Sequence, residues 1–405
     1  MKKAAYNYYQ NPKTQKPLWV IGGVLILLCM SVTLYFLLPL NKPTDKPKTN
    51  VAVPAQKTTT YNTVEGRYLF HGTVAWERAI ERDARGNYDR PFSMLDTFDR
   101  QKYDAWIADL ECPVTTKTVP YQTQVDSLQF NCPPAFNAAA KKYFDIFNLA
   151  NNHTDDLGRD GFLETQKHLT DSGFQVYGGP DLTDSQNHCE VISLPIHLKG
   201  AGKTDQAALP VAFCAYHAVA RSPTTAELES VRAYAKVMPV FAFAHLGVEY
   251  TATVTSQQQT LARDLVDAGA EFVIMNHPHW VQSTDVYKGK LIVYSTGNFL
   301  FDQLTYEEQR SASYDIMISA KYNDNIKTWI KLVQSCGAEE LHDSCFAELP
   351  KNLAKPTFNY HYELVAGDER PPQRWIPRKA DKALQADTER RANWQSTLQT
   401  LSQSQ

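Results

Sequence analysis

The chain has 405 residues, 43% of them hydrophobic, which is enough for two or three domains with a large core. This composition excludes wholesale disorder and a small disulfide-held scaffold, and the net charge of −3 excludes a strongly basic nucleic-acid-binding protein. The charge is unevenly distributed. Residues 1–65 carry eight lysines and two acidic residues, a net +6, which leaves −9 for residues 66–405. We therefore expect residues 1–65 and residues 66–405 to lie in different environments.

The first predicted element is a transmembrane helix over Leu18–Leu40, a stretch without a charged side chain. About 20 apolar residues are enough to cross a bilayer as a helix. A cleaved signal peptide is the alternative, but its apolar region is normally about 7 to 15 residues long and ends at a small-residue cleavage site. Here NKPTDKPK follows. We therefore expect an uncleaved single-pass anchor in the cell membrane, with residues 1–17 cytoplasmic and the large C-terminal part extracytoplasmic.

Residues 41–65 are rich in Pro, Thr and Lys without apolar periodicity, which is typical of an extended linker. Six cysteines follow, an even number compatible with disulfides outside the cytosol. Cys336 and Cys345 are the pair that we expect to be bonded, and reduced, buried cysteines are the alternative. The sequence contains no C-x-x-C, so a cysteine zinc site has no support.

From about residue 68 onward, short apolar runs alternate with amphipathic ones, which predicts an α/β sheet. Residues 323–377 read as an extension of this domain, and residues 378–405 as a polar helix or frayed tail. Strands are predicted over residues 68–74, 105–110, 146–150, 211–216, 237–245, 271–275 and 291–295, and helices over residues 161–172 and 256–268.

Five of these strands are followed at once by side chains that bind metals or transfer protons. In open α/β sheets ligands bind outside the carboxyl ends of strands, so we expect these groups to converge. Imidazole, carboxylate and carboxamide together suit Zn²⁺, Mn²⁺ or Fe, whereas Ca²⁺ or Mg²⁺ would call for oxygen alone. A satisfied core histidine is the alternative for any single position, above all His71. The groups are His71 and Thr73; Asp109 and Glu111; Asn151, Asn152 and His153; His245 and Glu249; and Asn276, His277 and His279.

The sequences of these segments resemble those of a known family. DLECPVT, ANNHTDDLG, HLGVEY, NHPHWVQ and KGKLIVYSTGNFLFDQ occur in the order found in the CapA family of poly-gamma-glutamate capsule synthesis proteins. The resemblance extends from about Arg67 to Asp315. It implies a domain over residues 66–322 that is similar to calcineurin-like metallophosphoesterases, an α/β sandwich of α-β-β-α layers.

The resemblance also implies a metal site. Its cofactor would be one or two divalent ions, Mn²⁺, Zn²⁺ or Fe, which activate water and stabilise the attacking and leaving oxygens of a hydrolysis. The implied ligands are Glu111, Asn152, His245 and His277, with His279 as a further ligand or directly behind one.

Three residues would act around that site. His153 would face the substrate as an acid or as a donor to phosphate, and Arg78 would contact an anion. Asp302 would orient a ligand histidine, with an ordinary helix cap or loop carboxylate as the equal alternative.

One motif departs from the family pattern. The family usually has Gly-Asp at the first strand, where the aspartate is an expected ligand, and this chain has Gly72-Thr73. A neutral hydroxyl is a poor ligand for these cations, so one metal position should be weakened or empty unless another group compensates. The two candidates for compensation are His71, which shares a strand face with Thr73, and Asp109.

Two functions compete on these grounds. The first is a membrane-anchored, metal-dependent hydrolase acting on a phosphoester or on an anionic envelope polymer such as poly-gamma-glutamate. The second, which Thr73 favours, is a non-catalytic accessory subunit that holds the polymer beside capsule ligase or export subunits. An anchored domain with a vestigial site is a third possibility. Because residues 66–405 carry −9, any polyanion would have to be held by local metal and basic groups.

Overall fold

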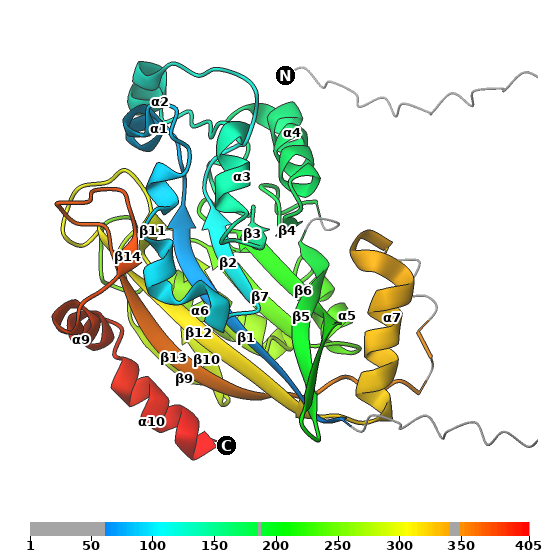
Figure 1. Cartoon of the computed structure of the whole chain (residues 1–405). Coiled ribbons are helices and arrows are strands. Elements are labelled where there is room, and N and C mark those ends of the chain that lie inside the picture. The colour runs from blue at the N-terminus through cyan, green and yellow to red at the C-terminus, as the bar shows by residue number, and fades with distance from the viewer. Residues whose placement is uncertain (1–60, 185–187, 341–348, 351, 405) are drawn as a thin grey trace, which may run out of the picture. The chain divides into compact units, whose positions relative to one another are not determined.

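Strand β1 (Tyr61–Val74) is the central strand of a large mixed α/β sheet (Figure 1). The structure is a computed structural model, and it describes residues 61–184, 188–340, 349–350 and 352–404. The described strands follow the order β14-β13-β12-β1-β5-β6-β7-β8-β10-β9, and β2, β3, β4 and β11 branch off beside β1. Their bounds are β2 (Ala105–Leu110), β3 (Ile146–Asn148), β4 (Gln175–Tyr177), β5 (Cys189–Gly200), β6 (Lys203–His217), β7 (Val240–His245), β8 (Phe272–Asn276), β9 (Thr284–Tyr287), β10 (Lys290–Val293), β11 (Asn298–Leu300), β12 (Arg310–Lys321), β13 (Asn359–Asp368) and β14 (Arg378–Lys379).

The sheet branches because β1 changes partners along its length. Its first part pairs antiparallel with β5 and β12, and its last part pairs parallel with β2 and β11. The pairing with β2 begins at Tyr68 and shifts its register between Phe70 and Thr73, which brings Thr73 opposite Asp109. Gly72 lies at this shift, where a Cβ atom would collide with the carbonyl oxygen of Gly297. The HGT segment therefore needs glycine so that the end of β1 can approach β11.

Two parallel groups of strands end at the candidate site. One contains β1, β2, β3 and β4, and the other contains β6, β7, β8 and β10. All residues of β2 and β7 are buried, as expected for central parallel strands with apolar sequences such as AWIADL and VFAFAH. The polar residues after these strands are thereby held on a rigid support.

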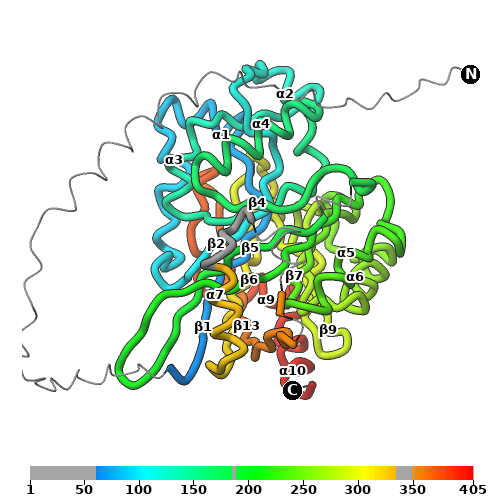
Figure 2. Tube along the Cα trace, turned by 90° about the vertical axis from the view of Figure 1, so that its right-hand side faces the viewer, coloured from blue at the N-terminus to red at the C-terminus, as the bar shows by residue number. Residues whose placement is uncertain are grey.

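The helices surround the sheet. In Figures 1 and 2, α1, α2, α3 and α4 lie at one end of the molecule and α10 at the other. Helix α6 begins at a capping box formed by Thr255 and Gln258 and ends at Gly269, as residues 256–268 predict. The helices are α1 (Arg78–Ala84), α2 (Tyr121–Ser127), α3 (Asn137–Ala140), α4 (Gly158–Asp171), α5 (Glu229–Ala235), α6 (Ser256–Ala268), α7 (Asp324–Glu340), α9 (Lys382–Arg391) and α10 (Trp394–Ser404), with 3₁₀ turns η1 (Arg90–Phe92), η2 (Leu95–Phe98), η3 (Arg100–Lys102) and η4 (Pro134–Phe136).

The seven predicted strands correspond to β1, β2, β3, β6, β7, β8 and β10, and the two predicted helices to α4 and α6. The prediction missed the long antiparallel strands β5, β12 and β13, whose polar residues interrupt the apolar runs. Strand β13 extends the sheet beyond β12, so residues 323–377 contribute directly to it. The C-terminal segment is helical, but Trp394 and Leu401 are buried, so it packs on the domain as well as facing solvent.

Several predicted features fall outside the described residues: the span Leu18–Leu40, the tail before it and nearly all of the linker. Within the part that the structure describes, no helix is both long and apolar enough to cross a membrane. Cys345 and the side chain of Cys336 also lie outside that part. The described disulfides are Cys112–Cys132 and Cys189–Cys214, which join residues distant in sequence.

Candidate metal centre

Four of the expected ligands lie at or after strand ends, each with a buried ligand atom. Glu111 follows β2, Asn152 follows β3, His245 is the last residue of β7, and His277 follows β8. One ligand atom each from Glu111, His245 and His277 lies within 4.8 Å of the others, and all three residues are buried. These are strand ends from both parallel groups, so the site forms where the two groups meet.

The ligand atoms of this group lack hydrogen-bond partners within the described part of the chain. They are both carboxylate oxygens of Glu111, Oδ1 of Asn152, Nε2 of His245 and Nδ1 of His277. A buried polar atom left without a partner costs about 1–3 kcal/mol. Imidazole nitrogen together with carboxylate and amide oxygen is a donor set for Zn²⁺, Mn²⁺ or Fe. The residues present therefore fit a divalent cation.

Asp109 orients His245 toward that position. The Nδ1 atom of His245 lies 2.7 Å from Oδ2 of Asp109, and because a carboxylate only accepts, Nδ1 carries the proton. Nε2 then faces Glu111, 3.6 Å from Oε1. The other Asp109 oxygen accepts from Asn148 at 3.2 Å and Asn151 at 3.1 Å. In this arrangement Asp109 supports His245, and its expected role as a compensating ligand stays a prediction.

The charges of the ligands depend on one another. Burial lowers the pKa of His245, but Asp109 and Glu111 outweigh burial and raise it to about 10. Burial raises the pKa of Glu111, but His279 and His245 outweigh it, so the carboxyl stays ionised. Burial and the positive charge of His245 lower the pKa of His277 to about 3, which leaves it neutral at pH 7. A carboxylate and a neutral imidazole are thus available to a cation.

The segment after β8 holds two histidines in an unusual backbone conformation. His277 has φ 100° and His279 has φ 58°, in the region that L-residues rarely adopt. Nδ1 of His279 donates to Oδ1 of Asn298 at 2.8 Å, which leaves Nε2 facing Glu249 at 3.8 Å. Strained backbone of this kind is common at functional sites. The structure thus places His279 beside His277 with one nitrogen available.

His153 lies against an aromatic ring. It stacks on Phe130 with ring centroids 3.9 Å apart, and its Nδ1 lies 2.9 Å from Oδ2 of Asp156. The same Asp156 oxygen accepts from the backbone N–H of Phe130 at 2.7 Å. Burial lowers the pKa of His153, but Asp156 and Glu111 outweigh it and raise that pKa. These contacts fix the ring that was expected to face the substrate.

Arg78 and Asp302 contact each other. Arg78 makes two hydrogen bonds to Asp302, lies 3.0 Å from Oε1 of Glu77, and places its guanidinium 4.1 Å from the centroid of Phe130. Two carboxylates therefore already bind the guanidinium that was expected to contact an anion. Asp302 also accepts from the backbone N–H of Ala79. The structure thus gives Asp302 the role of holding Arg78 and the start of α1.

His71 lies apart from the ligand group, in an aromatic core. Its ring is 3.9 Å from that of Phe299 and 4.5 Å from that of Trp106, and Nδ1 lies 2.8 Å from Oγ of Ser313. Burial lowers its pKa well below the usual value, so the ring is neutral. The expectation that His71 compensates for Thr73 does not agree with this position, because the register shift after Phe70 changes which side chains share a face.

Three further residues at the site escaped sequence reasoning: Phe130, Glu77 and Asp156. Phe130 and Glu77 meet at Arg78, although Phe130 comes more than 50 positions later in the chain. No periodic pattern connects them. Asp156 had a local signal, since it follows His153 by three residues in NHTDD. A second group of potential ligands, Glu77 with Cys112 and Cys132, is unsuited to metal because the two cysteines form a disulfide.

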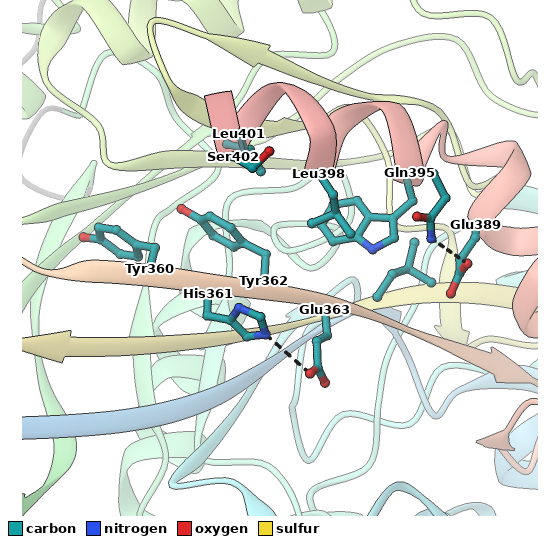
Figure 3. A pocket seen from close by; sticks show the side chains of 11 residues that line it. Tyr360, His361, Tyr362, Glu363, Glu389, Gln395, Leu398, Leu401 and Ser402 are labelled. Atoms are coloured by element: carbon teal, nitrogen blue, oxygen red, sulfur yellow. Dashed lines mark hydrogen bonds and ion pairs between the residues drawn. The ribbon is translucent and has the colours of Figure 1, made fainter. Parts of the chain in front are cut away.

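A groove lies away from this centre. It has a volume of about 550 Å³ and runs between β13 and the last two helices, α9 and α10 (Figure 3). Tyr362, Trp394 and Leu398 line it together with Glu363 and Glu389. None of the candidate ligands borders the groove.

Comparison with known proteins identifies the family. Residues 67–303 match the family described as bacterial capsule synthesis protein PGA_cap, and the chain belongs to that family. The match covers the segments that carry the four candidate ligands. The resemblance to CapA proteins is thereby confirmed.

Individual relatives agree with this assignment. The chain is 28% identical over 232 residues to the capsule biosynthesis protein CapA of Bacillus anthracis, covering 54% of this chain and 50% of that protein. It is 29% identical over 171 residues to the PGA biosynthesis protein CapA of Bacillus subtilis (strain 168), covering 40% and 43%. The chain thus spans about half the length of the curated relatives it matches. A solved structure, TT1561 of Thermus thermophilus, aligns at 9% identity and a TM-score of 0.34, covering 63% of this chain and 94% of that one.

Proposed function

We propose that this protein is a metal-dependent hydrolase-type member of the capsule synthesis family, acting on a phosphoester or on an anionic envelope polymer such as poly-gamma-glutamate. The observation that carries the proposal is the set of buried, unpartnered ligand atoms on Glu111, Asn152, His245 and His277. The proposal includes a fold of the calcineurin-like metallophosphoesterase type. A polar site at the carboxyl ends of parallel strands supports it.

Each residue of the centre has a distinct task in this proposal. A divalent cation bound by Glu111, Asn152, His245 and His277 would supply an activated water and neutralise charge on the substrate oxygen. Asp109 accepts the Nδ1 proton of His245, so a cation would bind at Nε2 by displacing the proton that the raised pKa keeps there. Asp156 and Glu111 raise the pKa of His153, which favours the protonated ring, and His153 donates to the leaving group.

The test combines metal content with activity of the full chain, purified in mild detergent and supplied with Mn²⁺ or Zn²⁺. We expect bound metal in the wild type and hydrolysis of either a generic phosphoester or poly-gamma-glutamate, with both lost in Glu111→Gln. Glu190→Gln is a matched control, because Glu190 lies in β5 outside the ligand group. A wild type that binds no metal, or a Glu111→Gln variant that keeps full activity, would overturn the proposal.

A second function is favoured by one residue. Thr73 stands beside Asp109 in the sheet, at the place where the family usually has an acidic ligand. With a weakened metal position the protein would act as a non-catalytic accessory subunit that holds the polymer beside ligase or export subunits. If the metal-loaded full chain hydrolyses neither substrate but co-purifies with membrane partners, this second function replaces the first.

A further inference from the structure

The Cys112–Cys132 disulfide lies directly next to a proposed metal ligand. Cys112 follows Glu111 in the chain, and both half-cystines are fully buried. The bond closes a loop of the chain with a sequence separation of 20. The backbone of Glu111 is thus one residue away from a covalent link to another part of the site.

The other half of this disulfide belongs to a well-anchored segment. The backbone N–H of Cys132 donates to the carbonyl of Pro113 at 2.7 Å, and the backbone N–H of Trp76 donates to Sγ of Cys132 at 3.1 Å. Two residues earlier, Phe130 stacks on His153 and lies under the guanidinium of Arg78. Besides its backbone hydrogen bond to Pro113 in the Glu111 segment, the region of Cys132 is therefore held by the segment after β1, by α1 and by the loop after β3.

We propose that the Cys112–Cys132 disulfide is a positioning element of the metal centre, which holds Glu111 in its ligating position and makes metal affinity depend on oxidation of this bond. The inference rests on the proposed function. Both Glu111 oxygens lack a hydrogen-bond partner among the described residues, so no hydrogen bond holds the carboxylate group in place. Its Oε1 lies 3.6 Å from Nε2 of His245, beyond hydrogen-bond distance, so the position of the side chain depends mainly on its backbone. That backbone is held by the hydrogen bond from the Glu111 N–H to the carbonyl of Val74 at 2.9 Å and, at the next residue, by the disulfide.

The second disulfide lies in a different context. Cys189 and Cys214 are opposite each other in β5 and β6, two antiparallel strands that are paired along the whole length of β5. Removing this bond leaves the strand pairing in place. It closes a loop of similar length, with a sequence separation of 25, so its removal should destabilise the fold by a similar amount. It is therefore a matched control.

Reduction of Cys112–Cys132 is a balanced exchange with a dithiol reagent. One S–S bond breaks and two thiols form, with two electrons and two protons taken from the dithiol, which closes to its own cyclic disulfide. The proposal therefore predicts that the reduced protein binds metal more weakly than the oxidised protein once the dithiol, which itself binds Zn²⁺, has been removed under anaerobic conditions.

The experiment measures Mn²⁺ and Zn²⁺ affinity of the full chain by isothermal titration calorimetry. We expect Cys112→Ala/Cys132→Ala to bind metal about 10- to 100-fold more weakly than wild type, as is usual when the support of a ligand is removed. Cys189→Ala/Cys214→Ala should stay within about twofold, although the melting temperatures of both variants fall. Should Cys112→Ala/Cys132→Ala fail to fold, folded Cys189→Ala/Cys214→Ala is reduced with a dithiol, which breaks the remaining described disulfide. The dithiol is removed anaerobically before the titration, and the same loss of affinity is expected.

The outcomes separate this inference from the proposed function. Equal affinity with and without the Cys112–Cys132 bond overturns the inference and leaves the metal centre standing. Equal loss in both disulfide variants also overturns it, because the effect would then be one of global stability. A wild type that binds no metal under oxidising conditions overturns the proposed function and the inference with it.

Discussion

Asp109 shows how one residue at this site can be close to the metal ligands without being one. Its two oxygens accept from His245, Asn148 and Asn151, so its acceptor capacity is directed at other side chains. A carboxylate behind a ligand histidine fixes the tautomer and raises the basicity of the ring. The strand register places Asp109 directly opposite Thr73, the position at which the family usually has an aspartate.

Replacing Asp109 should therefore weaken metal binding without abolishing it. In Asp109→Asn, one carboxylate oxygen becomes an NH₂ group, which cannot accept a hydrogen bond. This NH₂ group must face either the Nδ1 proton of His245 or the side-chain amides of Asn148 and Asn151, so a donor on that side loses its acceptor. We expect affinity for Mn²⁺ or Zn²⁺ to fall about 10- to 100-fold by calorimetry. Asp104→Asn, in the loop before β2, serves as the control. Complete loss of metal, as expected for Glu111→Gln, would show that Asp109 is itself a ligand.

Thr73 allows a test by gain of function. Thr73→Asp restores a carboxylate opposite Asp109 at the end of β1, where a second cation would find a ligand. We expect metal content by elemental analysis to rise from about one ion per chain toward two. Thr73→Asn, of similar size but without the charge, is the control. An unchanged metal content in Thr73→Asp would show that Thr73 does not mark a missing ligand position.

Glu77 introduces a pH dependence of stability. Burial and the nearby Asp302 raise its pKa from 4.5 to about 7, against the opposing effect of Arg78. Between pH 4.5 and 7 the unfolded chain has lost this proton while the folded chain keeps it, so the free energy of unfolding falls as pH rises. Glu77→Gln should show a smaller decline over that range in urea unfolding with metal removed by chelation. Identical slopes in both proteins would contradict the assignment.

At the scale of elements, the C-terminal helices belong to the domain. Trp394 at the start of α10 is buried and meets the ring of Tyr314 in β12 at 5.4 Å. The carbonyl of Ala392 accepts from both the backbone N–H and the hydroxyl of Thr284 in β9. These contacts join the end of the chain to β12 and β9, which lie on opposite sides of β1 in the strand order.

Trp394→Ala should consequently destabilise the fold and leave the site intact. Removing a buried tryptophan typically lowers the free energy of unfolding by about 3–5 kcal/mol. Since Trp394 contacts none of the candidate ligands, we expect metal affinity of the folded variant to remain within about twofold of wild type. Urea unfolding and calorimetry on the same preparation measure both quantities. A large loss of metal affinity would show that α10 also supports the site.

At the scale of the whole molecule, the charge separates the chain into two parts. Residues 1–65 carry +6 and residues 66–405 carry −9. The compact unit that contains the site begins at Thr59, close to this boundary. A basic front end beside an uncharged apolar stretch, followed by an acidic domain with disulfides, agrees with the proposal of an anchored, extracytoplasmic protein.

This arrangement predicts a clear fractionation result. The full chain should sediment with membranes and require detergent for extraction, whereas residues 59–405 should remain in the soluble fraction. External protease should degrade the domain in intact cells whose outer surface is exposed, because we propose that it lies outside the membrane. Recovery of the full chain in the soluble fraction without detergent would contradict the anchor.

The sequence by itself determined the parts of this protein that depend on local pattern. The apolar runs predicted the central parallel strands, since buried strands need continuous apolar residues. The strand-end motifs predicted a group of ligands, of which the structure brings Glu111, His245 and His277 together. The order of those motifs was sufficient to identify the family. The apolar runs and the motifs are each formed by residues close to one another in the sequence.

The tertiary structure alone decided what distant segments do to one another. The register shift in β1 sent His71 into an aromatic core and brought Thr73 beside Asp109. Arg78 met Asp302 from a distant loop, and Cys112 met Cys132 instead of another cysteine. Such pairings depend on strand register and loop packing over many positions. No periodicity in the sequence records them, because the free energy that selects them comes from burial in the assembled core.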